Sequence, residues 1–474
     1  MGTDAKSEAK NKKKTDGHGG RVRMRVDEGS RSWTVEWAIP RKAGIVCAGL
    51  GCIDMQLNQA TGGDGGEAIE TFQGETSIGG GSVSMACKTL ARLTHGEPLQ
   101  NEDRNGTGNY KQVNPPAVHS VIPLCKIGSD NTGDKLVSYL EGCGSACHNV
   151  NCKYTKLARD RDGDARTALA VLPIYLDGRR GCFFDAASCA TFSTPQLEEM
   201  MTDLATDSSS SLVSDSTPFV GAFLFGYPHL LPMMQGEALA SIFITAREFM
   251  DEGGVTALDL NGVPDTGLAQ RTTMVSVQDL KASPVLGPAL SHVDILHMNE
   301  DELVNLTGCQ IEGTDASHLE DEVNIASAIS LFLMCGVAVV AVTRGKRGCF
   351  ICCNDLDRFQ RSPALPPSWV DSSTKLGVIE LPPDTRINTN GAGDSFTSGL
   401  LVAALLRQTG AAESQPDSPN CLMTNPSLNL ESAAQFATLV AAHHVDTSTR
   451  DLKHLDLGAL IEKSLIVPQG QEES

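Results

Sequence analysis

Short apolar runs alternate along this chain with stretches of helical periodicity. Six of the runs have the composition of buried β-strands: Gly44–Leu50, Val118–Pro123, Phe219–Leu224, Val255–Leu260, Val293–His297 and Val337–Val342. Several of the stretches between them are predicted helices: Gly81–Leu93, Gly133–Tyr139, Glu237–Met250 and Glu300–Leu306. Alternation of this kind indicates a sheet with helices on both of its faces. We therefore expect an α/β fold.

Two further apolar stretches have other interpretations. Thr167–Tyr175 is followed, after Gly178, by Cys182–Phe184, which predicts an antiparallel hairpin outside the main sheet. Residues 323–343 contain no charged side chain and are long enough to span a bilayer. Because Gly336 divides them into a helical part and a β-branched part, we expect a buried helix and strand and no membrane span.

The polar stretches suggest how the chain is organised. Residues 1–43 and 467–474 are predicted to be disordered tails. Five internal stretches have the composition of surface loops or insertions: Gly62–Glu75, Thr94–Pro116, Thr206–Thr217, Asn354–Lys375 and Gln408–Pro426. What remains is roughly 300 residues, which suits one domain over 44–466 better than the three domains that a length of 474 residues would suggest.

Charge and cysteine content narrow the class of protein. With 38 Lys and Arg against 58 Asp and Glu, the net charge is −20. That argues against binding to nucleic acid or to an anionic membrane, although backbone N–H groups can still hold a phosphorylated ligand. The 15 cysteines, with no secretory signal before them, favour a reducing compartment, so we expect a cytoplasmic protein. The basic run Lys10–Lys14 offers a nuclear location as the alternative.

The segment most indicative of chemistry is Asn388-Thr389-Asn390-Gly391-Ala392-Gly393-Asp394-Ser395-Phe396, followed by an apolar helical run. Small residues before a helix expose backbone N–H groups at its N-terminus, where the helix dipole also favours an anion. Asp394 would lie beside that anion, which makes chemical sense if it accepts a proton from an attacking hydroxyl. A simple helix cap is the alternative role for Asp394.

This segment resembles the C-terminal signature of the pfkB-type, ribokinase-like carbohydrate kinases. Other segments match the family in the same order over about residues 44–450: Gly49–Asp54, Gly79–Ala86, Lys126–Gly133, Gly178–Arg180, Asp259–Asn261, Asn299–Glu302 and Thr343–Gly348. The resemblance implies a ribokinase-like three-layer α/β/α sandwich. It also implies a small β lid, formed from parts of 66–80 and 165–190, through which the chain would form a homodimer.

The resemblance also implies the roles of individual residues. Asp394 would be the general base, and the carboxylate of Glu302 would act on Mg²⁺ through water. The remaining roles are the anion hole (Gly391, Ala392, Gly393), the substrate site (Asp54, Gly79, Gly80, Gly81, Ser84) and the nucleotide site (Asn299, Thr343, Gly345). From the residues alone, a turn cap is the alternative role for Asp54, and an acidic helix N-terminus is the alternative for the Asn299–Glu302 motif.

The implied activity is Mg²⁺- and ATP-dependent phosphorylation of an alcohol group on a sugar or sugar-like substrate. A nucleoside kinase is one alternative, and a family member that has lost catalysis and acts as an interaction protein is another. The chain departs from the family at two positions: Ser84 stands where Asn is usual, and Asn388 stands where Asp is common. Because that Asp lies near a monovalent-cation site, its replacement argues against potassium activation.

Overall fold

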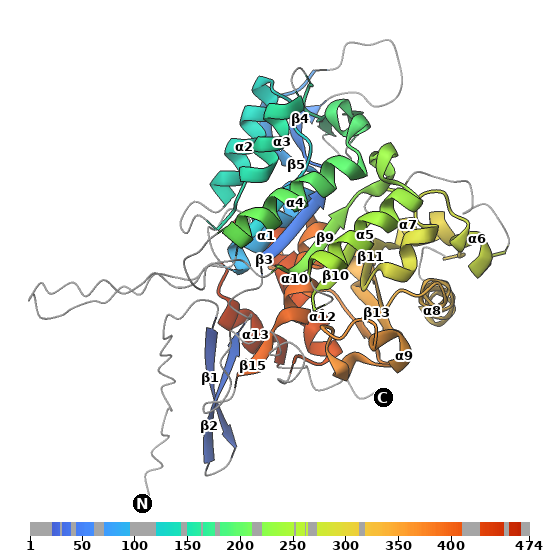
Figure 1. Ribbon diagram of the computed structural model, residues 1–474. Coiled ribbons are helices and arrows are strands. Elements are labelled where there is room, and N and C mark those ends of the chain that lie inside the picture. The colour runs from blue at the N-terminus through green and yellow to red at the C-terminus, as the bar shows by residue number, and fades with distance from the viewer. Residues whose placement is uncertain are drawn as a thin grey trace, which may run out of the picture.

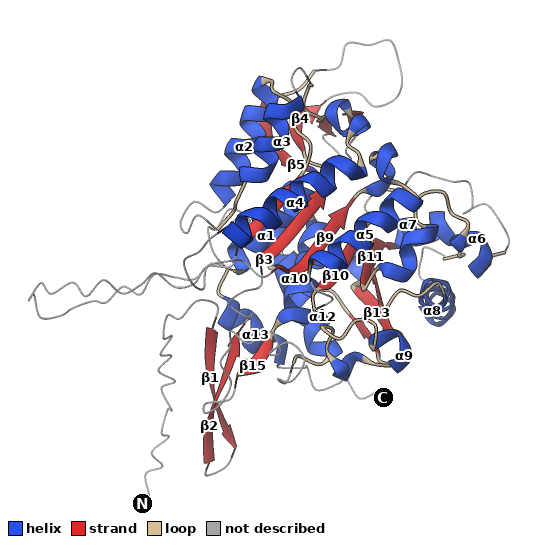
Figure 2. Cartoon of the chain, in the orientation of Figure 1, coloured by secondary structure: helices blue, strands red, loops and turns tan. Residues whose placement is uncertain are grey.

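The computed structural model describes fifteen segments of the chain: residues 21–28, 31–38, 44–60, 71–94, 120–143, 149–162, 165–175, 181–210, 220–250, 253–260, 262–263, 273–311, 318–409, 427–449 and 455–465. In them, helices cover both sides of a central sheet, and a smaller sheet projects beyond one end of it (Figures 1 and 2). This is the α/β arrangement predicted from the alternating pattern.

The central sheet has eight strands in the order β14-β13-β12-β11-β10-β9-β3-β6. The six predicted strands form its parallel part: β3 (Gly44–Gly49), β6 (Val121–Leu124), β9 (Val220–Gly226), β10 (Val255–Asp259), β11 (Ile295–Asn299) and β12 (Val339–Thr343). The sheet is extended by two antiparallel strands, β13 (Cys349–Cys353) and β14 (Ser373–Leu376).

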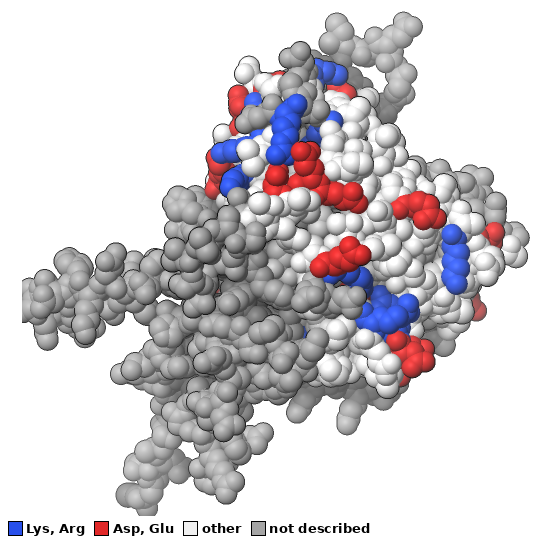
Figure 3. Space-filling model, in the orientation of Figure 1, with Lys and Arg blue, Asp and Glu red and all other residues white. Residues whose placement is uncertain are grey.

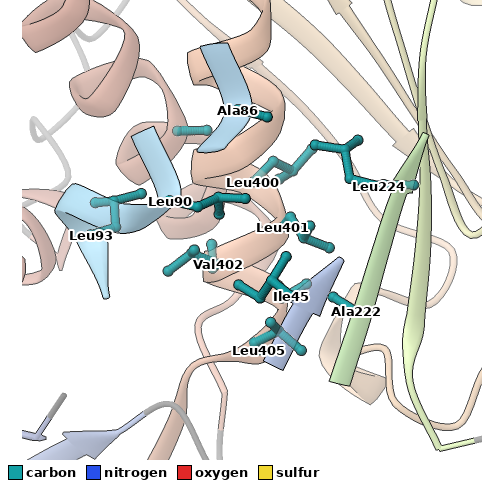
Figure 4. Close-up of a cluster of buried hydrophobic side chains, with 14 of the residues drawn as sticks. Ile45, Ala86, Leu90, Leu93, Ala222, Leu224, Leu400, Leu401, Val402 and Leu405 are labelled. Carbon is teal, nitrogen blue, oxygen red and sulfur yellow. The ribbon is translucent and has the colours of Figure 1, made fainter. Parts of the chain in front are cut away.

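Both faces of the central sheet carry a hydrophobic core, because side chains alternate along a strand. In β3, Ile45 and Cys47 pack into one core, and Val46 and Ala48 pack into the other. Figure 4 shows Ile45 among leucines of α1 and α10. The helices of the first core are α1 (Gly81–Leu93), α2 (Asn131–Cys143), α10 (Ala392–Leu405), α12 (Leu430–Val445) and α13 (Leu457–Leu465). Those of the second are α3 (Lys153–Asp162), α4 (Thr194–Ser210), α5 (Glu237–Phe249), α6 (Val277–Lys281), α7 (Glu300–Thr307) and α8 (His318–Met334).

The smaller sheet has the strand order β5-β4-β7-β8. Its strands are β4 (Cys52–Ala60), β5 (Glu75–Gly80), β7 (Leu169–Tyr175) and β8 (Phe183–Asp185). The predicted hairpin is confirmed, with Leu169 opposite Asp185 in an antiparallel register. Residues 66–70 and 176–180 of the expected lid lie outside the described residues. β4 was not foreseen as part of the lid, although it joins β5 to β7.

Within 1–43, the prediction of an irregular tail is wrong for residues 21–28 and 31–38. These residues form two antiparallel strands, β1 (Arg21–Glu28) and β2 (Arg31–Ala38), and β2 also pairs with β15 (Arg407–Thr409). The segment RVRMRVDE alternates apolar and charged residues, which is the pattern of a strand with two unlike faces. The many charged residues of this segment made the two-residue alternation hard to recognise as a strand pattern.

The prediction that Asn354–Lys375 is a surface loop is also wrong. Trp369 in this segment is 0 % exposed, and its indole N–H donates to the carbonyl oxygen of Leu428 at 2.8 Å. Ala364 and Leu365 are buried with it. The segment also contains α9 (Leu356–Phe359) and the beginning of β14, so it covers one end of the sheet.

The helix and strand expected within residues 323–343 are confirmed. α8 ends at Met334, Gly336 adopts a left-handed φ of 104°, and β12 begins at Val339. Among the described residues, no helix has both the length and the apolar character needed to cross a bilayer. In the described part of the face in Figure 3, acidic and basic side chains lie in small neighbouring groups.

Candidate active site

Polar residues gather where four neighbouring parallel strands end. Tyr227 directly follows β9, Asp259 is the last residue of β10, Asn299 the last of β11 and Thr343 the last of β12. The first turn of α10, with Asp394 as its third residue, packs near them, because α10 contacts both β10 and β11. The carboxyl ends of parallel strands are where open α/β sheets bind ligands.

Asp394 is buried, and its carboxylate faces the side chain of Tyr227. The Tyr227 hydroxyl lies 3.1 Å from Oδ1 and 2.9 Å from Oδ2 of Asp394. Asp394 is 1 % exposed, and the residue that caps α10 is Gly391, which uses no side chain. The alternative role of Asp394 as a simple helix cap is therefore wrong, because its carboxylate points to a phenol.

The surroundings of Asp394 favour its protonated form. Burial raises the pKa of the carboxyl well above its usual range, and the neighbouring charges of Asp259 and Asp54 act in the same direction. The hydrogen bond from Tyr227 opposes them and lowers the pKa. Shifted carboxyl groups of this kind are typical of sites that transfer protons.

The glycine residues before α10 are needed for close packing. Gly391 has a φ of 81°, and a Cβ atom there would lie 2.9 Å from both His444 Nε2 and Met85 Sδ. A Cβ on Gly393 would lie 3.3 Å from His297 Cε1. The N–H of Ala392 donates to the Thr389 carbonyl oxygen at 3.1 Å. The Ala392 amide is thus engaged in this state, and so is the Ser395 amide, which donates to the Gly391 carbonyl oxygen at 3.0 Å.

Asp54 lies in β4 and contacts the loop that precedes α10. It is therefore not the last residue of the first strand of the central sheet, as the motif suggested, and it does not cap a turn. Asn390 Nδ2 donates to Asp54 Oδ2 at 3.1 Å. A Cβ on Gly80 would lie 1.8 Å from Asp54 Oδ1, so only glycine fits beside this carboxylate.

The other expected substrate residues serve packing in this state. A Cβ on Gly79 would lie 2.2 Å from the ring of Tyr139, and one on Gly81, where φ is 72°, would lie 2.6 Å from the carbonyl oxygen of Leu50. Ser84 is fully buried in α1, and its Oγ has no hydrogen-bond partner within the described segments.

Asn299 and Glu302 form a reciprocal cap at the N-terminus of α7. Asn299 Oδ1 accepts from the Glu302 N–H at 2.9 Å, and Glu302 Oε2 accepts from the Asn299 N–H at 2.8 Å. Glu302 Oε1 accepts from the Gly262 N–H. The capping alternative is therefore correct as a structural role, and burial raises the pKa of Glu302. The capping role does not exclude binding, because a carboxylate has about four lone-pair positions.

A buried line of polar side chains joins α10 to the end of β12. The Thr397 hydroxyl donates to Asp259 Oδ2 at 2.7 Å, and Asp259 Oδ1 lies 3.4 Å from His297 Nδ1. His297 Nε2 lies 3.1 Å from Thr343 Oγ1. His297 and Tyr227 could not be recognised from sequence as site residues, because each continues an apolar run and no motif marks it.

The loop after Thr343 is held against the beginning of α7. Arg344 Nε lies 2.7 Å from Glu300 Oε2, and Arg347 also pairs with Glu300. Gly345 has a φ of 54°, a left-handed conformation that favours glycine. A Cβ atom there would meet no atom within 4 Å, so the space beside Gly345 is open. The loop and the Asn299–Glu302 cap are thereby fixed to each other.

The acidic groups at this edge fit a cation that keeps its water shell. No group of three or more His, Cys, Asp or Glu residues in the described chain could cage a metal directly. Asp259 Oδ1 is buried without a hydrogen-bond partner in the described parts, and Glu302 keeps spare lone pairs. Mg²⁺ is usually held in this indirect way, through waters and substrate phosphates.

Comparison with known proteins agrees with the motifs. Residues 268–450 match the model of the pfkB family carbohydrate kinases, and that range contains Asn299, Glu302, Thr343, Gly345 and the Gly391–Asp394 loop. Over these residues the chain is similar to the pfkB family. Asp54 and Gly79–Ser84 lie before the matched range.

The fold of the chain is ribokinase-like, as expected. Ribokinase from Giardia lamblia superimposes with a TM-score of 0.53 at 15 % identity, over 89 % of this chain and 99 % of that one. Ribokinase from Thermotoga maritima superimposes with a TM-score of 0.51 at 15 % identity, with the same coverage of both chains. Arabidopsis thaliana ribokinase, solved with ribose and ATP, gives 0.50 at 17 % identity over 90 % and 99 % of the two chains.

Proposed function

We propose that this chain is an ATP-dependent kinase that transfers the γ-phosphate to an alcohol group of a sugar or sugar-like substrate. Asp394 is the general base, and the Gly391–Gly393 loop is the anion hole. The observation that carries the proposal is the contact between Asp394 and Tyr227. A hydroxyl group already lies within hydrogen-bond distance of a buried carboxylate in the first turn of a helix that begins with Gly-Ala-Gly.

The proposed reaction needs a base and a set of hydrogen-bond donors, and the site provides both. Asp394 takes the proton of the acceptor alcohol as its oxygen attacks the γ-phosphorus, and ADP leaves on the opposite side. Amides at the start of α10 stabilise the charge that develops on the transferring phosphoryl group. Mg²⁺, which Glu302, Asn299 and Asp259 would hold through water, supplies further neutralisation of phosphate charge.

The acceptor side of the site is built around Asp54. A carboxylate accepts hydrogen bonds only, so it suits a ligand that presents hydroxyl groups. Asn390 donates to one oxygen of Asp54, and the Cys52 thiol donates to the other at 3.5 Å. A carboxylate has about four lone-pair positions, so it can accept from a ligand as well. The Arabidopsis structure contains ribose together with ATP, which supports a sugar as the acceptor.

A panel of acceptors tests the proposal. ADP release from Mg·ATP is measured with pentoses, hexoses, polyols and nucleosides, each supplied in excess. Strong stimulation by a sugar supports the proposal. Stimulation by nucleosides alone would identify a nucleoside kinase, and absence of both stimulation and ATP binding would indicate an interaction protein.

We place the contact of a homodimer on the smaller sheet. Phe183 in β8 and Phe72, shortly before β5, are 69 % and 49 % exposed. Sedimentation of the native chain and of Phe183→Ser distinguishes a dimer through this face from a monomer.

A further inference from the structure

The backbone of Tyr227 is held in a conformation that bulky residues rarely adopt. Its φ of 63° and ψ of 50° are left-handed, and such a conformation persists only where the surroundings enforce it. The Tyr227 N–H donates to the Asp259 carbonyl oxygen at 2.9 Å, and its own carbonyl oxygen accepts from Leu230 N–H at 3.1 Å. The neighbouring strand and the following turn therefore fix the backbone from which the phenol projects.

The phenol lies where an acceptor alcohol has to bind. An alcohol that gives its proton to Asp394 must come within about 3 Å of a carboxylate oxygen. Both oxygens of Asp394 are already within hydrogen-bond distance of the Tyr227 hydroxyl. Tyr227 and Asp394 are both buried, so water has little access to the base while the phenol is in place. Asp54, the acid of the expected acceptor site, contacts Asn390 in the loop that leads into α10, so the acceptor would bind near Asp394.

We propose that Tyr227 occupies the base until an acceptor displaces it, and that it thereby couples ATP turnover to the presence of an acceptor. Tyr227 is a positioning residue in this account, because it acts through Asp394. The inference rests on the proposed function, since it assigns Asp394 the role of base.

The reaction that Tyr227 suppresses is hydrolysis. In the productive reaction, the acceptor O–H gives its proton to Asp394, an O–P bond forms, and the bond from the γ-phosphorus to the β–γ bridging oxygen breaks. In hydrolysis, water replaces the acceptor, gives one proton to Asp394, and inorganic phosphate leaves with ADP. Both reactions need Asp394 as the base. The Tyr227 hydroxyl covers Asp394 without reacting, so it favours an acceptor that can displace the phenol over water.

Tyr227→Phe tests the inference, because it removes one oxygen and keeps the ring. ADP release from Mg·ATP is measured without acceptor and with saturating ribose, or with whichever panel member stimulates most. We expect the ratio of acceptor-free to acceptor-stimulated turnover to rise roughly ten- to a hundredfold, the scale of one hydrogen bond to a charged group. Tyr154→Phe, in the core beside α4, is the matched control and should leave the ratio unchanged.

A second readout separates this role from a merely structural one. Loss of the phenol removes the donor that stabilises ionised Asp394, so the acid limb of the kcat/KM profile should move to higher pH in Tyr227→Phe. The inference would be overturned if Tyr227→Phe, with native thermal stability, kept both the native ratio of acceptor-free to acceptor-stimulated turnover and the native acid limb of the kcat/KM profile. If the native chain itself shows no acceptor-stimulated turnover, the proposed function fails first, and the two failures are thus distinguishable.

Discussion

Asn390 donates a hydrogen bond from Nδ2 to Asp54 Oδ2 at 3.1 Å, although the two residues are 336 positions apart in the chain. The contact joins the smaller sheet to the loop that leads into α10. The other side of the same loop is fixed by His444, whose Nε2 lies 2.8 Å from the Asn390 carbonyl oxygen. The acceptor acid and the expected anion hole are therefore positioned together.

Asn390→Ala should weaken acceptor binding. Without its amide donor, Asp54 loses a hydrogen bond in a buried setting, and its carboxylate is free to turn. We expect the KM for the acceptor to rise about tenfold, the scale of one such bond, with the KM for ATP nearly unchanged. Asn58→Ala, farther along β4, is the control, and equal acceptor KM values in both variants would refute the link.

His297→Ala should act through Thr343. The contact of His297 Nε2 with Thr343 Oγ1 fixes that hydroxyl at the expected nucleotide site. We expect the KM for ATP to rise about tenfold, with a partial return in His297→Gln, whose amide can reach the same hydroxyl. If His297 acts through Thr343, the effects of His297→Ala and Thr343→Val will not add in the double variant.

Two substitutions of Glu302 separate its capping role from its role with the metal. Gln still offers one acceptor oxygen to the cap, whereas Ala offers none, so Glu302→Ala should lose about 1 kcal/mol more unfolding free energy. Both variants lack the charge, so both should need severalfold more Mg²⁺ for half-maximal turnover. Asp301→Asn, next to it and exposed, is the control. A native Mg²⁺ requirement in Glu302→Gln would rule out the metal role.

Asp394 should make the unliganded protein less stable as the pH rises. Its pKa is raised by burial and by Asp259, so the folded chain keeps a proton that the unfolded chain releases above about pH 3.9. The stability linked to Asp394 is complete below that pH and is lost as pH rises toward the folded pKa. Asn cannot ionise, so Asp394→Asn should melt at a higher temperature than the native chain at pH 8, and the difference should shrink toward pH 4. A constant difference across that range would contradict the raised pKa.

The alternating strands and helices of the main sheet could be predicted from sequence, because the apolar positions in the sequence are the positions that are buried in the fold. The apolar runs at β3 and β9–β12 are buried on both faces, and continuous hydrophobicity is typical of such strands. β1 and the segment around Trp369 were missed for opposite reasons. β1 is highly charged, and the Trp369 segment is mostly polar, although Phe359, Ala364, Leu365 and Trp369 fill core positions in it.

At the site, motifs predicted residues that share a loop or helix start, but not contacts across the sheet. Asp394 and Gly391 were found because both lie in one short segment. Tyr227 reaches the site from the end of β9 and His297 from the middle of β11, inside apolar runs that look like core. Only the strand order brings them to Asp394 and Thr343.

Turnover of Asp394→Asn tests the central claim most directly. ADP release is measured with saturating Mg·ATP and the best acceptor, and nucleotide binding to the variant is verified separately. If Asp394 is the base, kcat falls by about 10²–10⁴-fold while the variant still folds and binds ATP. Turnover equal to that of the native chain would contradict the account.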